Sequence, residues 1–163
     1  MEQRRWDALF ADLEAELEGE EARELDGEVR DRTRREHARL TLADRLVAHE
    51  GVTVTVTTTA GPVRGVVTDA AKDWVLVDQT LIPRTAIVSV RGLGAAARDP
   101  EQRPVAELPV GYALRRLAAE HDEVTCTFAD GRTTRGAITR VGRDHVDIGG
   151  EAIPFRAIAT VRP

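Results

Sequence analysis

The chain has 163 residues, a net charge of −5 and a single cysteine, so an internal disulfide bond and a metal site built on several cysteines are excluded. No apolar run approaches the roughly 20 residues that span a bilayer, and the N-terminus lacks the pattern of a signal peptide, so we expect a cytoplasmic protein with no membrane partner. The acidity lies in residues 1–50, where 15 Asp and Glu side chains stand against 9 Arg, and a pI near 5.4 disfavours a protein held to nucleic acid by net charge alone.

Residues 4–49 have the spacing of an amphipathic helix. Trp6, Phe10 and Leu13 recur at intervals of four and three residues, which places them on one face. The period slips near Gly19, where a kink or a hairpin turn is expected. We assign residues 1–41 to a helical segment whose apolar stripe packs on the rest of the chain or on a second copy. A protein partner docked on this acidic helix is the alternative.

The hydrophobic period changes from 3.6 to 2 after Gly51. Residues 52–57 alternate Val with Thr, which predicts a half-buried strand. Further strands are predicted at 63–69 and 74–78, and two short ones within 81–91. Five short strands joined by tight turns predict a small closed or nearly closed barrel with a leading helix over residues 42–94, the first repeat.

Residues 95–109 are rich in Gly, Ala and Pro and predict a linker. A short helix is expected at 110–121, and strands resume at Val124 with a hairpin turn at Asp130-Gly131. Residues 110–163, the second repeat, are therefore predicted to form a second barrel with its own leading helix. The expected fold class is α+β, mainly β, with two tandem five-stranded barrels.

The second repeat is a copy of the first. Residues 65–91 shifted by 71 lie on residues 136–162 without a gap, and ten of the 27 positions are identical. This frequency indicates an internal duplication. The identical pairs are Gly65/Gly136, Thr68/Thr139, Asp73/Asp144, Val75/Val146, Ile82/Ile153, Pro83/Pro154, Ala86/Ala157, Ile87/Ile158, Val90/Val161 and Arg91/Arg162.

The duplication predicts the role of several paired residues. Val75 and Val146 belong to the core of each repeat, and Cys126, which aligns with Val56, is expected to be a buried structural thiol. Gly65 and Gly136 lie inside a strand pattern, where glycine typically permits a bend or a close approach of another backbone segment.

Both repeats resemble the Sm-like family of RNA-associated proteins, which includes Sm, LSm and Hfq. The stretch from Asp130 to Ile138, with glycines at 131 and 136, is similar to the first motif of that family, and Ala157-Ile158-Ala159-Thr160-Val161 resembles the second motif of Hfq. The resemblance covers residues 42–91 and 113–163. It implies assembly through edge strands, in which the fourth strand of one barrel pairs with the fifth strand of the next. A two-barrel chain would satisfy one such edge internally, and three chains would form a six-barrel ring.

The chain departs from the family at the residues that bind nucleotide. The Asp that commonly follows the glycine of strand two by six residues is replaced by Ala71 and Gly142, and the Lys-His pair of the Hfq motif by Arg84-Thr85 and Phe155-Arg156. The uridine-binding chemistry of the family is therefore not carried over, and Asp73 and Asp144 are expected to close turns.

Two loops of each repeat remain candidates for binding RNA. RNA-binding proteins stack bases on planar side chains and hold phosphates with basic ones. The loops before the third and fifth strands supply such groups, and the Sm-like resemblance implies that they lie near one another, since they flank neighbouring strands. The candidate nucleic-acid-binding residues are Lys72, Trp74, Arg84, Arg143, His145, Phe155 and Arg156; ordinary turns with solvated charges are the alternative.

Trp74 and Leu76 alternate with core residues and should point out of the first barrel. Their counterparts, His145 and Asp147, are polar, so only the first repeat has an apolar outer stripe. We expect the N-terminal helix, the other barrel or another subunit to cover it. The candidate interface residues are Trp6, Phe10, Leu13, Trp74 and Leu76.

No catalytic motif is present, and we predict neither an enzyme nor a cofactor. The resemblance favours an RNA-binding or RNA-associated Sm-like regulator, and we expect a bacterial one. Lys72 is the only lysine beside 22 Arg, a bias that we attribute to a GC-rich genome and not to function. An interaction scaffold that kept the barrel and lost the nucleotide pocket is the second interpretation, and a DNA-binding transcriptional regulator is the third. Self-association through barrel edges is expected in each case.

Overall fold

The structure, a computed structural model, describes residues 38–97 and 106–163. Residues 41–163 form one compact unit, which is mainly β with two helices, α2 (Leu42–Ala48) and α3 (Val110–Glu120). The predicted α+β class is confirmed at this level. The predicted N-terminal helix with Trp6, Phe10 and Leu13 lies outside the described residues, as do residues 98–105 of the linker.

A capping box begins helix α2. Thr41 has an extended backbone with φ −93° and ψ 165°. Its hydroxyl accepts a hydrogen bond from the Asp44 amide at 3.2 Å, and the Asp44 carboxylate accepts one from the Thr41 amide at 2.7 Å. The prediction of continuous helix up to residue 49 is therefore wrong at residues 40 and 41, because the Thr41 and Asp44 side chains satisfy the first amides of a new helix.

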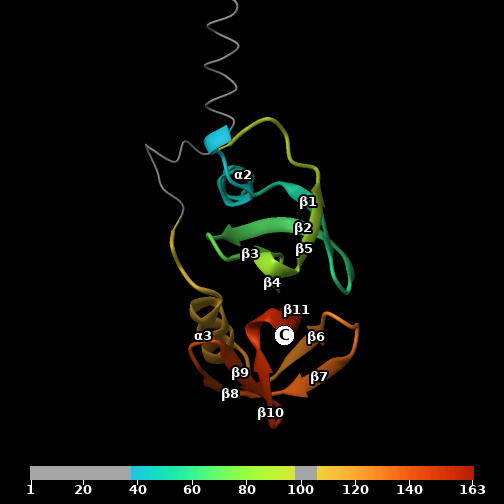
Figure 1. The fold of residues 1–163 in the computed structure, drawn as a ribbon, viewed down its shortest axis with the longest axis vertical. Coiled ribbons are helices and arrows are strands. Elements are labelled where there is room, and N and C mark those ends of the chain that lie inside the picture. Colours follow the sequence, from blue (N-terminus) through green and yellow to red (C-terminus); the bar gives the residue numbers. More distant parts are fainter. Residues whose placement is uncertain (1–37, 98–105) are drawn as a thin grey trace, which may run out of the picture. The chain divides into compact units, whose positions relative to one another are not determined.

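The first repeat contributes five strands, β1 (Thr53–Thr58), β2 (Gly61–Ala70), β3 (Trp74–Val77), β4 (Thr80–Pro83) and β5 (Ile87–Arg91), with a 3-10 turn η1 (Arg84–Ala86) before the last. The second contributes β6 (Val124–Phe128), β7 (Thr133–Gly136), β8 (Ile138–Val141), β9 (His145–Ile148), β10 (Glu151–Pro154) and β11 (Ile158–Arg162), with η2 (Phe155–Ala157) before β11. Figure 1 shows these elements in chain order.

The strands form two open sheets, so the prediction of two five-stranded barrels is wrong in detail. One sheet has eight strands in the order β5-β1-β2-β3-β4-β11-β6-β7, and the other has the order β10-β9-β8. The long strand β2 has no single counterpart, because the equivalent stretch of the second repeat is interrupted at Ala137 into β7 and β8. The second repeat consequently has six strands, divided between the two sheets.

Equivalent hydrogen bonds confirm the duplication. Arg84 N donates to Asp73 O at 2.8 Å, and Phe155 N donates to Asp144 O at 2.9 Å, 71 residues later. A hydrogen bond from Ala71 N to Trp74 O, of 3.0 Å, closes the turn before β3. The equivalent bond from Gly142 N to His145 O, of 2.9 Å, closes the turn before β9. The same backbone conformation is thus reached twice by sequences that differ at most positions.

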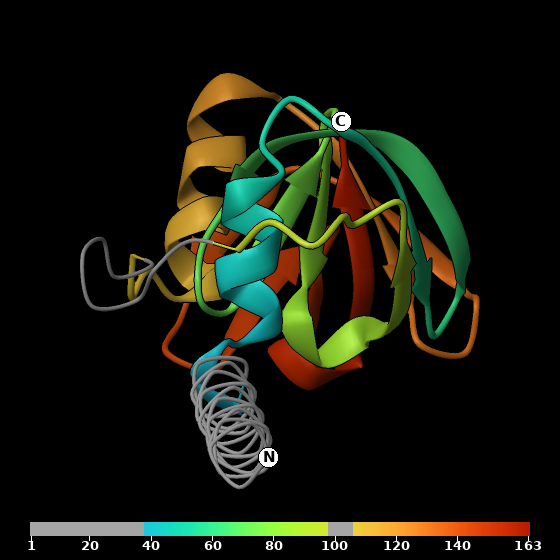
Figure 2. The same ribbon diagram turned by 90° about the horizontal axis from the view of Figure 1, so that it is seen from above.

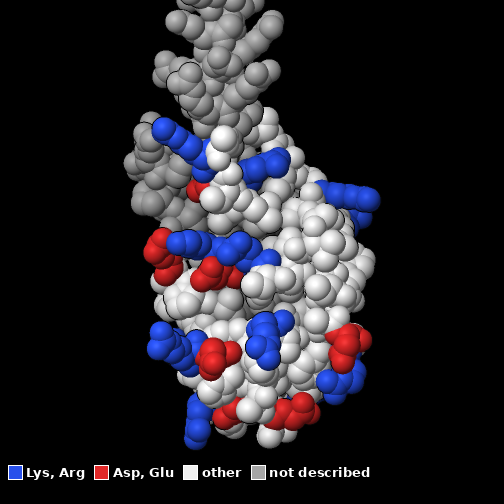
Figure 3. All heavy atoms as spheres, viewed as in Figure 1, with Lys and Arg blue, Asp and Glu red and all other residues white. Residues whose placement is uncertain are grey.

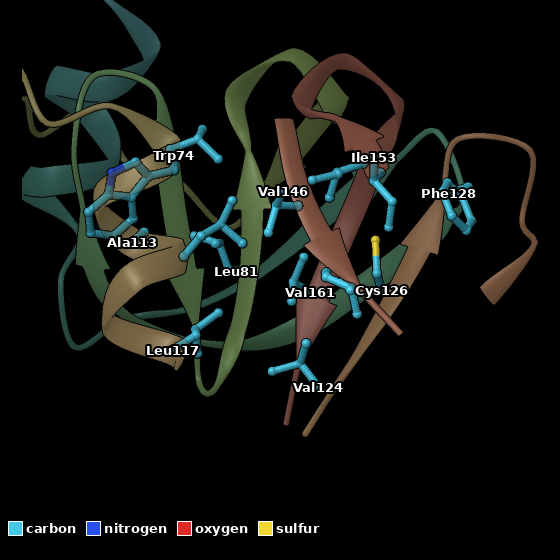
Figure 4. Close-up of a cluster of buried hydrophobic side chains, with 14 of the residues drawn as sticks. Trp74, Leu81, Ala113, Leu117, Val124, Cys126, Phe128, Val146, Ile153 and Val161 are labelled. Carbon is cyan, nitrogen blue, oxygen red and sulfur yellow. The ribbon is translucent and has the colours of Figure 1, made fainter. Parts of the chain in front are cut away.

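Two cores hold the unit together. The first is built within the first repeat around Val54, Val56, Val67 and Val75. The second centres on the second repeat but also takes in Trp74 and Leu81 of the first, as Figure 4 shows. Val75 and Val146, and also Val56 and Cys126, are fully buried at equivalent positions, as predicted.

The two repeats are joined through a shared sheet. Strand β4 of the first pairs antiparallel with β11 of the second, with Leu81 opposite Val161. An edge pairing within the chain was the expectation that the resemblance implied, and the observed pair is β4 with β11. Helices α2 and α3 lie on one side of this unit, and the β1–β2 and β6–β7 hairpins lie on the other (Figures 1 and 2).

Glycine at positions 65 and 136 permits the close approach that was predicted. A methyl group on Gly136 would lie 2.6 Å from the Cα of Gly149, and one on Gly65 would overlap the Asp78 carboxylate. Asp78 and Gly149 are themselves equivalent, and both have positive φ, 50° and 58°. The Asp78 side chain holds its strained backbone in place by accepting a hydrogen bond from Val66 N at 2.9 Å.

Candidate nucleic-acid interface

The loops before the third and fifth strands meet in both repeats, as predicted. In the second repeat the bond from Phe155 N to Asp144 O ties η2 to the loop between β8 and β9. In the first, the bond from Arg84 N to Asp73 O joins the equivalent segments. The structure therefore brings together Arg143, His145, Phe155 and Arg156 in one cluster, and Lys72 and Arg84 in the other.

His145 in the second-repeat cluster is positioned by its neighbours. Its Nδ1 donates to the Asp144 carboxylate at 2.9 Å, a bond that lowers the pKa of Asp144. The ring lies so close to Gly142 that a methyl group there would be 2.7 Å from Nδ1. Any other residue at position 142 would displace the imidazole. The His145 side chain is 38% exposed.

Arg143 and Arg156 are the arginines of this cluster that form no ion pair. Both are exposed, and neither has an ion-pair or side-chain hydrogen-bond partner within residues 38–97 and 106–163, although the charge of Arg143 contributes to the lowered pKa of Asp144. An exposed guanidinium without an ion-pair partner can bind a phosphate bidentately without first breaking another pair. These two side chains therefore suit a phosphate better than any others in the predicted set.

Phe155 is only partly available to a ligand. The ring is half-buried and packs against the second core, where it faces Gly111 at the start of α3: a methyl group on Gly111 would lie 3.6 Å from the Phe155 Cζ. Such a ring can offer one edge or part of a face to a base.

The basic residues of the first-repeat cluster are paired with carboxylates. Lys72 Nζ lies 2.6 Å from Glu107 Oε1. This hydrogen bond and the opposite charge raise the pKa of Lys72 and lower that of Glu107. Arg84 lies 3.9 Å from the Asp73 carboxylate. The two repeats thus share a backbone but differ in charge at this site.

The sequence-based placement of Trp74 among base-stacking residues is wrong. The indole is 2% exposed, its Nε1 donates to Leu108 O at 3.1 Å, and it lies beside Ala113 of α3 (Figure 4). Leu76 is half-buried against the same core. The predicted apolar stripe exists, but α3 and the second repeat cover it within the chain.

Sequence reasoning missed the acidic partners of the first-repeat cluster. Glu107 is 35 residues from Lys72, at the end of the predicted linker, and no local pattern could indicate that the linker returns to this loop. The Lys72 amide also donates to Ala106 O at 3.1 Å, so the same linker segment is held along the loop.

Basic and acidic side chains are interspersed over the face shown in Figure 3, which is consistent with small binding sites. Within the part of the chain that the structure describes, no group of three His, Cys, Asp or Glu side chains could hold a metal ion. Neither described helix has the length and apolar character needed to cross a membrane. Comparisons with protein-family models, with curated proteins and with solved structures found no match.

Proposed function

We propose that the chain is an Sm-like protein with two tandem repeats that binds single-stranded RNA through the loop cluster of its second repeat. The observation that carries this proposal is a pair of exposed arginines without an ion pair, Arg143 and Arg156, on two segments that the bond from Phe155 N to Asp144 O joins. The same segments carry the partly exposed side chain of His145. Guanidinium groups hold phosphates, and planar rings stack on unpaired bases.

The edge pairing supports the Sm-like assignment. The resemblance implies that the fourth strand of one unit pairs with the last strand of the next. Strand β4 is the fourth of the first repeat, and β11, its partner, is the last of the second repeat and the equivalent of β5. The duplicated bond between the loops before the third and fifth strands is a second point of support.

Fluorescence anisotropy with labelled 15-nucleotide U-rich and A-rich RNA in 50 mM salt tests the proposal. We expect wild-type binding at micromolar concentration and about tenfold weaker binding by the double variant Arg143→Ala/Arg156→Ala, because each charge-assisted bond is worth about 1.5–3 kcal/mol before solvent screening. The salt slope should fall by about 0.7 for each phosphate that the variant no longer neutralises.

The matched control is Arg132→Ala/Arg140→Ala, which removes the same charge from the same repeat. These arginines are already paired with Asp130 at 2.8 Å and Asp147 at 3.8 Å, so binding should change little. Absence of wild-type binding at about 10 μM, where weak nonspecific association is still detectable, contradicts the proposal. Equal losses in the two double variants would show that only net charge matters. Tighter binding to DNA of the same sequence would favour the transcriptional-regulator interpretation.

Self-association is a second proposed property, and it is favoured by the free edges. Within the described residues, β5 pairs only with β1 and β10 only with β9, and Val88 on β5 is 66% exposed. The Trp74 stripe is covered, so among the described residues these edges are the surfaces that support the interaction-scaffold interpretation. An unpaired edge bearing an exposed β-branched residue favours pairing with another chain.

Light scattering after size exclusion tests this property. We expect a mass of at least twice the 17.9 kDa of one chain. If β10 pairs with β5 of the next chain, the expected assembly is a ring of three chains. Val88→Lys should shift the mass to that of one chain, because charge on an edge strand opposes pairing. Val52→Lys, at a residue 40% exposed before β1, is the control. A wild-type mass of one chain contradicts self-association.

A further inference from the structure

A row of arginine and threonine crosses the outer face of each repeat. In the first, Thr55 of β1 lies opposite Arg64 of β2 on one side and Arg91 of β5 on the other. The flanking Val54 and Val56 are buried, so Thr55 faces away from the core by the alternation of a strand. Two guanidinium groups and one hydroxyl therefore share a single outer row.

The second repeat has the same row at the duplicated positions. Thr125 of β6 lies opposite Arg135 of β7 and Arg162 of β11, and its neighbours Val124 and Cys126 are buried. Two arginines and a threonine have thus been kept at corresponding places in copies that differ at most positions. The hairpins that carry the two rows lie on the same side of the molecule, away from the helices (Figures 1 and 2).

Three of the four arginines have no counter-ion among the described residues. Arg64, Arg91 and Arg162 are exposed and have no ion-pair or side-chain hydrogen-bond partner there, whereas Arg135 lies 3.1 Å from Glu123. Neighbouring strands are about 4.8 Å apart, so Arg64 and Arg91 start about 10 Å from each other. Like charges at this spacing repel weakly and favour an anion that bridges them.

The residue types indicate which part of a nucleic acid would bind. Guanidinium groups and hydroxyls donate to phosphate oxygens, and neither row includes an aromatic ring on which a base could stack. The spacing suits a chain of phosphates better than a single ion, because one arginine stands on each side of the threonine hydroxyl. The rows differ in this respect from the loop cluster, which has His145 and Phe155.

We propose that these two rows bind the phosphate backbone of single-stranded RNA without regard to sequence. The proposal rests on the proposed function and gives it a second surface, in which the rows hold the backbone and the loop cluster contacts bases.

Anisotropy titration of the full chain with 15-nucleotide oligo-U RNA, and with oligo-dT DNA of the same length, tests the rows. Arg64→Ala/Arg91→Ala should bind each oligonucleotide about tenfold more weakly, with a salt slope reduced by about 0.7 for each phosphate left without its arginine. Arg135→Ala/Arg162→Ala should have a smaller effect, because Arg135 already has a partner. Affinity should fall by the same factor for RNA and DNA, since phosphates are common to both.

Arg132→Ala/Arg140→Ala again matches the change in net charge, and circular dichroism melting confirms that each variant is folded. If wild type binds RNA while the Arg64/Arg91 variant binds with unchanged affinity and salt slope, the row proposal is wrong and the loop site stands. If the row variant loses affinity for RNA only, the rows read the ribose and not the phosphates. If wild type binds no RNA, both proposals fail.

Discussion

Leu81 of the first repeat lies opposite Val161 of the second in the ladder between β4 and β11, and neither side chain is exposed. The two repeats therefore share a sheet and a core, although each copy carries its own helix and strands. Because the second core takes in Trp74 and Leu81 from the first repeat, neither repeat has a complete set of buried neighbours by itself.

This shared core predicts that the repeats unfold together. Leu81→Ala should destabilise the unit by about 2–5 kcal/mol, the usual cost of emptying a buried leucine site. Two probes can follow the unfolding. In a Trp6→Phe background, Trp74 fluorescence reports the contact between the first repeat and the second core, and the accessibility of Cys126 to a thiol reagent reports the second core within the second repeat. Coincident urea transitions by the two probes are expected. Two separate transitions would show that the repeats are independent domains.

The interrupted strand of the second repeat predicts a strong effect at Gly136. Gly136→Ala would force its new methyl group against the Gly149 backbone, 2.6 Å away, and overpacking of this kind typically costs about 1–3 kcal/mol. Gly111→Ala is the control, because its methyl group would meet Val141 and Phe155 at ordinary distances of 3.5 and 3.6 Å. Urea denaturation measures both, and equal stabilities of the two variants would argue against the close approach of β7 to Gly149.

Cys126 predicts a loss of stability at alkaline pH. Burial raises the pKa of its thiol to about 12, whereas an unfolded cysteine titrates near 8.5. The folded state thus keeps a proton that the unfolded state loses, so this contribution is intact below pH 8.5 and declines as the pH rises toward 12. The decline should reach up to about 2 kcal/mol at pH 10.

Cys126→Val isolates this contribution, because valine stands at the equivalent position 56 of the first repeat. Urea denaturation at pH 7.5 and pH 10 should show a smaller decline in the variant than in the wild-type chain. Identical declines would mean that the thiolate of Cys126 is tolerated in the fold.

The pairing of Lys72 with Glu107 predicts that the first-repeat loops can be made to bind RNA more strongly. Glu107→Gln removes the carboxylate 2.6 Å from Lys72 Nζ and leaves an unpaired cation beside Arg84. RNA affinity in 50 mM salt should rise by about two- to threefold through one added phosphate contact. Glu50→Gln changes net charge equally at another exposed site, and the same rise in both variants would attribute the effect to net charge.

Much of the fold could be predicted from the sequence, because the duplication allows the residues at each position to be compared between the two repeats. It predicted the buried places of Val75, Val146 and Cys126 and the close approach at Gly65 and Gly136. The meeting of the loops before the third and fifth strands was expected from the Sm-like resemblance, and not from the duplication. The buried places and the close approach depend on alternation, on turn residues and on the shift of 71, all of which are local or repeated signals.

The features that the sequence did not predict depend on contacts between distant segments. Burial of Trp74 under α3 removed a predicted base-stacking residue, and the return of Glu107 to Lys72 neutralised another candidate. The outer rows were partly visible, since Arg91 and Arg162 were an identical pair. Their alignment with Thr55 and Thr125 required the register of the sheet, which no local pattern provides.

Cross-linking of 4-thiouridine-labelled RNA to the full chain, followed by mass spectrometry of the peptides, locates the RNA-binding surface. We expect cross-links within residues 142–156, which hold the loop cluster, and their disappearance in Arg143→Ala/Arg156→Ala. Cross-links confined to the first-repeat loops around Lys72, or an absence of cross-linked peptides under conditions where RNA is in excess, would contradict this expectation.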